Sequence, residues 1–414
     1  MRNLHGKNTV RYYLLLVLML AVFFFSNDFG LTDVQKTAIV MAVGIDREED
    51  TFILTSQIAI PQSSKQGKAT ETVQLVSRGK TVADAFEEIN AKTGWYPKLV
   101  FCNLIVLGEK AATENVFDAL DYFLRDEYLS DNCFVATCDG LAKDMLNVTA
   151  LVDPSGSVAI QKVLSSHAQR VGAVLPATLR DFAIGYFSDS RCGYLPLLKT
   201  QPQQEKIDGE KQSNNSTPPS SGSSSNSSSN ENSGKGGNSS EEKKDKPVFS
   251  AGETALFVNG KRVEMLTREE SFAFGAIVNK LRLARYAVPL GEENCTLTIK
   301  QNQPKTIISV GKNDRVCLKI QIVLTAGIAD YSKSQDLSKI SDVGDLPKGV
   351  FDAAEKKLSA EIVRVFDKCR LCGCDLFGIQ ERLEKYEKKH ADRLADTALV
   401  NAIVDVDVKF RNVR

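Results

Sequence analysis

The sequence has very little histidine and no net charge, and both absences count against whole classes of function. Only three histidines occur among 414 residues, and His5 lies in the N-terminal tail. His167 and His390 lie in segments with a helical pattern and polar neighbours, so we interpret both as solvated surface residues. The 52 basic and 52 acidic side chains cancel, so nothing predicts attraction to nucleic acid.

Motifs of catalysis are also missing. No Gly-x-Ser-x-Gly motif is present, and residues 154–157 are better interpreted as a turn leading into a helix cap. Glycine-rich residues 234–237 lie in a low-complexity segment, so they cannot open a helix as a phosphate loop. Acidic residues gather at 46–50, but the twelve-residue calcium-loop pattern is absent. The sequence favours a protein that is not an enzyme and has no catalytic residue, cofactor or metal ion.

Nine cysteines, an odd number, show no spacing typical of a disulfide framework. Cys369-x-x-Cys372-x-Cys374 is the one cluster that resembles a ligand set. On a helix Cys369 and Cys372 share a face, whereas Cys374 lies about 140° around it, so three thiolates converge only if Gly373 breaks the helix. The cluster also lacks the helix N-terminus that lowers the thiol pKa in redox pairs. We interpret these cysteines as packed side chains.

One apolar run, residues 12–25, decides on which side of a membrane the chain lies. Basic residues precede it and polar residues follow, an arrangement that holds the N-terminus in the cytoplasm and exports the rest. About 14 residues at ~1.5 Å each give ~21 Å, short of a ~30 Å hydrocarbon core and typical of a signal peptide. Phenylalanines at 23–25 occupy the place of the small residues needed for cleavage. An uncleaved anchor is therefore favoured over a cleaved signal.

The next part of the chain alternates between strand and helix patterns. Residues 36–45 and 51–60 are β-rich runs joined by a charged turn, which predicts a hairpin. Residues 81–94 have a helical period, with Thr81 as N-terminal cap and Gly94 as C-terminal cap. Further strands and helices continue to about residue 138, so we expect an N-terminal α+β domain over 31–148.

Residues 201–247 form the clearest boundary, because serine, asparagine, glycine, glutamate and lysine dominate them. Such a segment cannot bury enough apolar surface to offset its ordering entropy, so we expect disorder. We interpret it as an insert in a middle domain spanning 149–285. A plain linker between two domains is the alternative.

Residues 286–414 carry a strong β signal, and the clean alternation over 404–410 marks the last strand. A long helical stretch over 351–396 would cover the apolar face, so we expect a C-terminal antiparallel sheet backed by a long helix. The expected fold class is α+β: three mixed domains of β-sheets packed with helices. They follow a segment, 1–30, that contains the cytoplasmic tail and a membrane-anchor helix or signal.

Several short motifs occur in a distinctive order. They are Gly44-Ile45-Asp46, Pro61, Leu124-Arg125-Asp126-Glu127, Cys374-Asp375-Leu376-Phe377-Gly378 with Glu381-Arg382, and the closing Val-Asp-Val-Asp-Val strand. Together they resemble the Ger(x)C family, the C subunits of nutrient germinant receptors in endospore-forming bacteria. The candidate positions, of structural or partner-binding role, are Gly44, Asp46, Pro61, Arg125, Asp126, Asp375, Phe377 and Gly378.

The resemblance implies a non-enzymatic receptor subunit acting in assembly or signal coupling during germination. It would lie on the outer face of the spore's inner membrane, with its N-terminus in the cytoplasm, and bind multi-spanning A and B subunits. No small-molecule ligand is implied for this chain. The family usually has a lipoprotein cysteine after the apolar segment, but the first cysteine here is Cys102, so an uncleaved helix would replace the lipid. An exported cell-envelope hydrolase with a divergent site and a generic envelope scaffold stay open as alternatives.

Overall fold

The computed structural model describes most of the chain apart from both ends and several internal segments. The described residues are 4–25, 37–59, 72–148, 153, 155–165, 172–201, 248–291, 293–311, 314–331, 349–394 and 397–413. Pro61 and His167 lie outside these residues. So do residues 202–247 of the insert, and the prediction that they are disordered.

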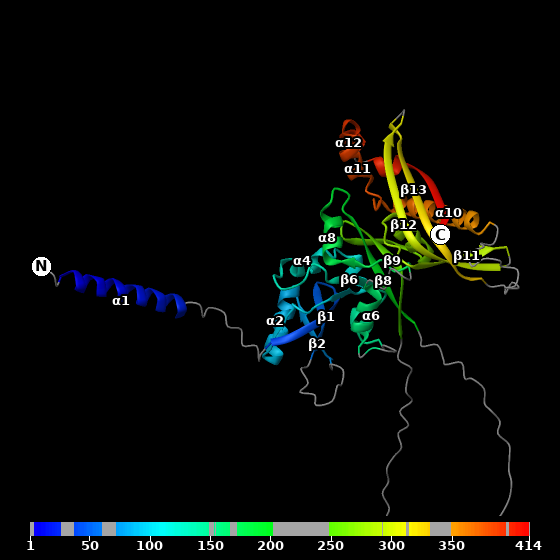
Figure 1. Ribbon diagram of the computed structural model, residues 1–414. Coiled ribbons are helices and arrows are strands. Elements are labelled where there is room, and N and C mark those ends of the chain that lie inside the picture. The colour runs from blue at the N-terminus through cyan, green and yellow to red at the C-terminus, as the bar shows by residue number, and fades with distance from the viewer. Residues whose placement is uncertain are drawn as a thin grey trace, which may run out of the picture.

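A ten-stranded mixed sheet organises residues 37–266 (Figure 1). Its main path runs β10-β9-β8-β6-β5-β1-β2-β3, with β4 beside β1 and β7 beside β6. The strands are β1 (Thr37–Glu48), β2 (Thr51–Ala59), β3 (Thr72–Gly79), β4 (Tyr96–Lys98), β5 (Leu104–Leu107), β6 (Phe134–Cys138), β7 (Ala177–Thr178), β8 (Cys192–Gln201), β9 (Val248–Val258) and β10 (Lys261–Leu266). The predicted hairpin is confirmed as β1 and β2, which pair antiparallel.

Strands from both sides of the expected boundary at 148/149 belong to this one sheet. β6 pairs in parallel with β8, where Thr137 is opposite Leu197 and Cys138 is opposite Leu198. β8 then pairs antiparallel with β9, and Gln201 is opposite Val248. The insert therefore connects two neighbouring strands. The three-domain division itself stays a prediction.

Helices cover both faces of the first sheet. They are α2 (Val82–Thr93), α3 (Glu109–Thr113), α4 (Phe117–Arg125), α5 (Ala142–Leu146), α6 (Gly156–Leu164), α8 (Leu179–Phe187) and α9 (Arg268–Ile277). One apolar core contains residues of α2, α4 and α8, and another, across the sheet, contains residues of α5 and α6. α2 forms as predicted: Thr81 and Asp84 make a capping box, and Gly94 ends the helix at φ 70°.

A four-stranded sheet follows, ordered β11-β12-β13-β14. Its strands are β11 (Ala284–Leu290), β12 (Glu293–Val310), β13 (Val316–Tyr331) and β14 (Ile403–Asn412). The first three pair antiparallel, but β14 runs parallel to β13, so the expectation of a wholly antiparallel sheet is corrected. The physical reason is the helical connection between β13 and β14, because such a crossover returns the chain in the same direction.

The C-terminal helices cover this second sheet. They are α10 (Val350–Cys372), α11 (Ile379–Tyr386), α12 (Lys388–Leu394) and α13 (Ala398–Asn401). The predicted continuous helix over 351–396 is wrong, because Gly373 and Gly378 adopt left-handed φ values of 72° and 61° and interrupt it. The predicted inward face of α10, which includes Leu358 and Phe366, is buried.

The N-terminal helix α1 (Leu4–Phe25) lies apart from both sheets in Figure 1. Within the described ranges, none of the helices combines the length and the apolar character needed to cross a membrane. The predicted transmembrane signal anchor is therefore not supported.

Candidate functional site

Asp46 is buried at the end of β1, where its carboxylate binds the start of α5. Oδ1 accepts from Ala142 N at 2.7 Å and Oδ2 accepts from Lys143 N at 3.1 Å. Burial raises the pKa of the Asp46 carboxyl above its ordinary value, although the two N–H donors act in the opposite direction. A Cβ on Gly108 would lie 2.0 Å from Oδ1, so a glycine there leaves the room that the carboxylate fills.

The other glycine of this motif, Gly44, has a similar steric role on β1. A Cβ at Gly44 would lie 3.0 Å from Leu146 Cδ1 and 3.2 Å from the Ala142 Cβ. Glycine at this position therefore gives the strand room to approach α5 closely. In the structure, Gly44 and Asp46 both serve the packing of α5 against the sheet.

The second motif ends α4 rather than forming an internal ion pair. Asp126 Oδ1 accepts from Tyr128 N and Leu129 N, both at 2.9 Å. Arg125 instead binds Asp121 at 2.7 Å on the exposed side of the helix. Asp126 thus stabilises the turn after α4, and Arg125 keeps its guanidinium at the surface.

The third motif begins α11. Asp375 is buried, and its carboxylate accepts from Ile379 N at 2.9 Å and Gln380 N at 3.0 Å. Burial raises the pKa of the Asp375 carboxyl, partly offset by these N–H donors. Gly378 holds the left-handed conformation that lets the chain turn into the helix.

Phe377 of the same motif connects the two sheets. Its ring is 4% exposed and meets Phe366 of α10 edge-on at 5.3 Å and Phe274 of α9 at 6.4 Å between ring centroids. One continuous apolar core contains these side chains together with residues of β8, β9 and the second sheet. We call the set Cys192, Phe274, Phe366, Asp375 and Phe377 the junction.

Cysteine thiols from distant parts of the chain meet at the junction. Gly373 does break the helix, and Cys374 N donates to Cys369 O at 2.9 Å, which turns Cys374 inward. Its Sγ donates to Phe257 O at 3.5 Å, while Asp375 N donates to the Sγ of Cys192 on β8 at 3.2 Å.

The thiol pKa values diverge within this cluster. The neighbouring Cys374 thiol lowers the pKa of Cys372 to about 7 and also lowers the pKa of Cys192. Cys374 and Cys369 are both buried, and their pKa values are raised well above the ordinary range. All four are free thiols. In the part of the chain that is described, no three His, Cys, Asp or Glu side chains are placed to hold a metal ion.

A small cleft of about 190 Å³ opens beside the junction. Asp181 and Tyr194 line it together with Cys192, Asp375 and Glu381. Its walls come from α8, β8 and the start of α11, so this cleft lies between the two halves of the molecule. It offers carboxylates and the Cys192 thiol, which accepts a hydrogen bond from Asp375 N.

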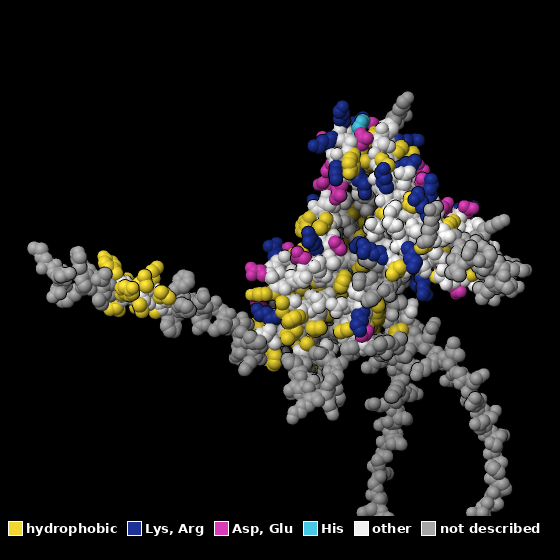
Figure 2. Space-filling model, viewed as in Figure 1, with side chains coloured by type: hydrophobic (Ala, Val, Ile, Leu, Met, Phe, Trp, Pro, Cys, Tyr) yellow, Lys and Arg dark blue, Asp and Glu magenta, His cyan; other side chains and the backbone are white. Residues whose placement is uncertain are grey.

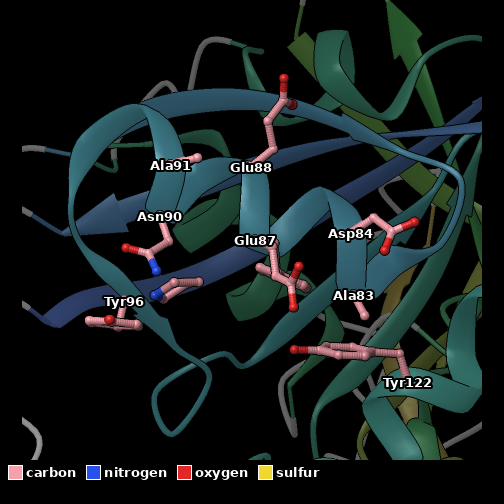
Figure 3. A pocket seen from close by; sticks show the side chains of 10 residues that line it. Ala83, Asp84, Glu87, Glu88, Asn90, Ala91, Tyr96 and Tyr122 are labelled. Carbon is pink, nitrogen blue, oxygen red and sulfur yellow. The ribbon is translucent and has the colours of Figure 1, made fainter.

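A wider hollow of about 870 Å³ lies along α2 (Figure 3). Glu87 and Tyr122 point towards one another across it, whereas Glu88 points away. Burial, with Asp126 and Glu87 nearby, raises the pKa of the Tyr122 phenol, so it stays a hydrogen-bond donor at neutral pH. The Tyr122 ring stacks on Phe86 at 5.2 Å. This arrangement can accept a polar group but shows no pairing of a nucleophile with a base.

The candidate positions do not gather in one place. Gly44 and Asp46 hold α5, Arg125 and Asp126 end α4, and the residues of the third motif build the junction. Sequence reasoning missed Cys192, which lies far from Cys374 along the chain. The only available signal was its position at the start of a strand, which does not predict a distant partner.

The overall architecture, two mixed sheets packed with helices, is that of a known fold. The crystal structure of the GerBC protein aligns with 90% of this chain and 97% of its own, with a TM-score of 0.52 and 14% sequence identity. The likeness establishes the fold alone.

Family models then identify the chain. The spore germination protein N-terminal domain matches residues 31–200, and the spore germination B3/GerAC-like C-terminal domain matches residues 252–414. The chain belongs to the Ger(x)C family of spore germination proteins, and the predicted resemblance is confirmed.

Two curated relatives from Bacillus subtilis (strain 168) are similar over part of their length. Spore germination protein B3 is 28% identical over 146 residues, which is 34% of this chain and 36% of the relative. Spore germination protein KC is 27% identical over 183 residues, which is 42% of this chain and 45% of the relative. The matched stretches thus span less than half of each relative.

Proposed function

We propose that this chain is a non-enzymatic subunit of a nutrient germinant receptor that acts in receptor assembly or signal coupling during spore germination. The observation that carries the proposal is that both domains of the family match this chain. The N-terminal domain matches before the insert and the C-terminal domain matches after it. Its proposed partners are multi-spanning A and B receptor subunits. Its proposed place is the outer face of the spore's inner membrane, with the N-terminus in the cytoplasm.

The junction supports a role in transmitting a conformational signal. Besides the ring contacts of Phe377, Lys368 of α10 donates to Glu270 at 2.8 Å and to Met265 O at 3.1 Å. Asn302 of β12 donates to Ala276 O at the end of α9 at 2.8 Å. Packed cores resist deformation, so a displacement of one sheet would carry the other with it. A subunit of this kind would pass on motion without any covalent step.

The surface of α1 supports attachment to a membrane. Residues 12–20 are all apolar, and their side chains are exposed around the whole circumference of the helix. A helix that is apolar all round needs an apolar surrounding. We propose that lipid supplies it, and the proposal requires contact with the bilayer without fixing the depth of insertion.

Affinity capture tests this function. The tagged chain is purified from detergent-solubilised spore membranes, and mass spectrometry identifies what co-purifies. We expect multi-spanning A-type and B-type subunits together with the intact N-terminal peptide. A sample in which a control membrane complex survives but no such subunit is recovered, or in which the chain appears only as a soluble trimmed form, would contradict the proposal.

A further inference from the structure

An apolar groove of about 300 Å³ lies where the first sheet begins. It is lined by Ala38, Ile58, Ala59, Val73, Leu75, Thr93 and Trp95. These residues come from the first residues of β1, the end of β2, the start of β3, the last residue of α2 and the turn after it. The groove is therefore at the end of the sheet where the chain arrives from α1.

Exposed apolar and aromatic side chains extend the groove past β4. We call the set Val73, Trp95, Tyr96, Val100, Phe101 and Tyr128 the β4 patch. Trp95 is 43% exposed and Phe101 is 54% exposed, and the other four are exposed to a similar degree. Figure 2 shows hydrophobic side chains gathered over this end of the N-terminal part of the molecule.

The β4 patch also carries a cation beside an aromatic ring. The Lys98 ammonium lies 4.6 Å from the centroid of the Tyr128 ring. Exposed apolar patches rimmed by polar residues mark sites of contact with proteins or membranes. Tryptophan, tyrosine and lysine together are typical of the interface between lipid and water, where one end of each side chain is apolar and the other is wet.

The chain itself keeps this patch close to α1. Ala38 lines the groove, and the twelve residues 26–37 separate it from the end of α1 at Phe25. A chain of this length spans at most about 45 Å when fully extended. Whatever surface covers the apolar residues of α1 is therefore within reach of the β4 patch.

Two occupants meet these conditions, α1 itself and a lipid bilayer. A groove of about 300 Å³ holds a few side chains, whereas α1 exposes an uninterrupted run of nine apolar residues, 12–20, on all its sides. Docking α1 in the groove would leave most of that surface in water. A bilayer covers both the helix and the patch, so the geometry favours lipid.

We propose that the β4 patch rests on the membrane surface, with Trp95 and Tyr96 at the level of the lipid headgroups and Phe101 inserted beside the acyl chains. The patch would hold the first sheet in a fixed orientation against the bilayer. This inference rests on the membrane attachment included in the proposed function.

The sole tryptophan of the chain makes the contact measurable, because Trp95 is the only source of tryptophan fluorescence. The full-length chain is reconstituted with vesicles of phosphatidylglycerol and phosphatidylethanolamine, and flotation reports binding in parallel. On binding, we expect emission from Trp95 to shift to shorter wavelength. We also expect quenching by lipids brominated in the upper acyl chain and a loss of quenching by iodide.

Variants localise the effect to the patch. Phe101→Ser and Val100→Ser remove exposed apolar side chains without touching Trp95, and we expect each to reduce the wavelength shift and the quenching by brominated lipid several-fold. Leu371→Ser is the matched control, because Leu371 is 85% exposed on the C-terminal side of the molecule. This variant should behave like the natural chain. Near-ultraviolet circular dichroism confirms that each variant stays folded.

The outcomes separate this inference from the proposed function. A chain that floats with the vesicles while Trp95 stays accessible to iodide would overturn the patch contact and leave membrane attachment intact. Shielding from iodide without quenching by brominated lipid would show that α1 or a second copy covers the patch, which also overturns the inference. A chain that does not float at all would contradict the membrane attachment itself.

Discussion

The junction and the β4 patch both contain clustered aromatic side chains, but the protein uses them in opposite ways. At the junction Phe274, Phe366 and Phe377 are buried against one another. At the β4 patch Trp95 and Phe101 remain exposed. In this chain Phe377 of the third motif packs the junction between the two sheets. The exposed aromatic side chains of the β4 patch lie outside the short motifs.

The polar motif residues show the same division. Asp46, Asp126 and Asp375 direct their carboxylates at backbone N–H groups of the chain itself. Acceptors placed in this way cap helices and turns, and fewer of their lone pairs remain for a partner. We therefore propose a structural role for these three positions, and a partner-binding role for them stays the alternative prediction.

Phe377→Ala should have the largest effect on stability. Removing a ring that is 4% exposed leaves a cavity between two sheets, and such changes cost about 3–5 kcal/mol. Phe101→Ala, at an exposed position of the β4 patch, should change the unfolding free energy by less than about 0.5 kcal/mol. Urea denaturation compares the two. Equal destabilisation would remove the distinction between junction and patch.

Gly108→Ala should follow in size. The new Cβ would lie 2.0 Å from Asp46 Oδ1, so the cap of α5 must shift, and we expect a loss of about 1–3 kcal/mol. Gly252→Ala is the matched control, because its Cβ would meet nothing nearer than 3.7 Å. Thermal unfolding followed by circular dichroism measures both. A normal midpoint for Gly108→Ala would show that Asp46 does not need its observed position.

The buried carboxyl of the junction should give stability a measurable pH dependence. Because the pKa of Asp375 is raised in the folded chain, the folded state binds a proton more tightly than the unfolded state just above the ordinary value of 3.8. The protonated Asp375 carboxyl therefore contributes to the stability of the folded chain. This contribution is fully present below pH 3.8 and is lost as the pH rises through the pKa of the folded state.

Urea titrations over roughly pH 4 to 6 test this dependence. The slope of the unfolding free energy against pH should decrease in Asp375→Asn. It should persist in Asp367→Asn, because the Asp367 carboxylate is exposed beside Arg370. An unchanged slope in Asp375→Asn would show that another group is responsible.

The smallest expected effect concerns reactivity, not stability. Cys372 is partly exposed with a pKa lowered to about 7, whereas the neighbouring Cys369 and Cys374 are buried with raised pKa values. Alkylation by iodoacetamide should therefore label Cys372 first, with a rate that rises through pH about 7. Peptide mass spectrometry reads the site, and Cys372→Ser should lose the early product. Preferential labelling of Cys374 would show that the junction is open to solvent.

Helix ends and buried helix faces were predictable from the sequence, because capping residues and apolar spacing lie within the helix itself. Thr81 and Gly94 marked the ends of α2, and the apolar spacing of α10 marked its buried face. The interruption after Cys372 was not foreseen, because the helical pattern of charged and apolar residues resumes in α11 and α12. Gly373 and Gly378, both in the left-handed conformation, separate α10 from α11, and Glu387 separates α11 from α12.

Long-range pairing was the part that the sequence could not supply. β6 and β8 pair at only two positions, and nothing in the composition of either strand indicates that the other is its partner. The parallel alignment of β14 depends on where the intervening helices return the chain. The meeting of Cys192 with Cys374 follows from that global arrangement, so no motif within either segment announces it.

The most direct test of the central claim is nutrient-triggered germination of spores that lack this chain. Spores with the gene deleted, spores complemented with the natural chain and spores complemented with Leu371→Ser are exposed to the same panel of nutrients. The fall in optical density reports germination. We expect the deletion to abolish the response to at least one nutrient and both complemented strains to recover it. A full response of the deletion spores to every nutrient that triggers the natural strain would contradict the assignment as a receptor subunit.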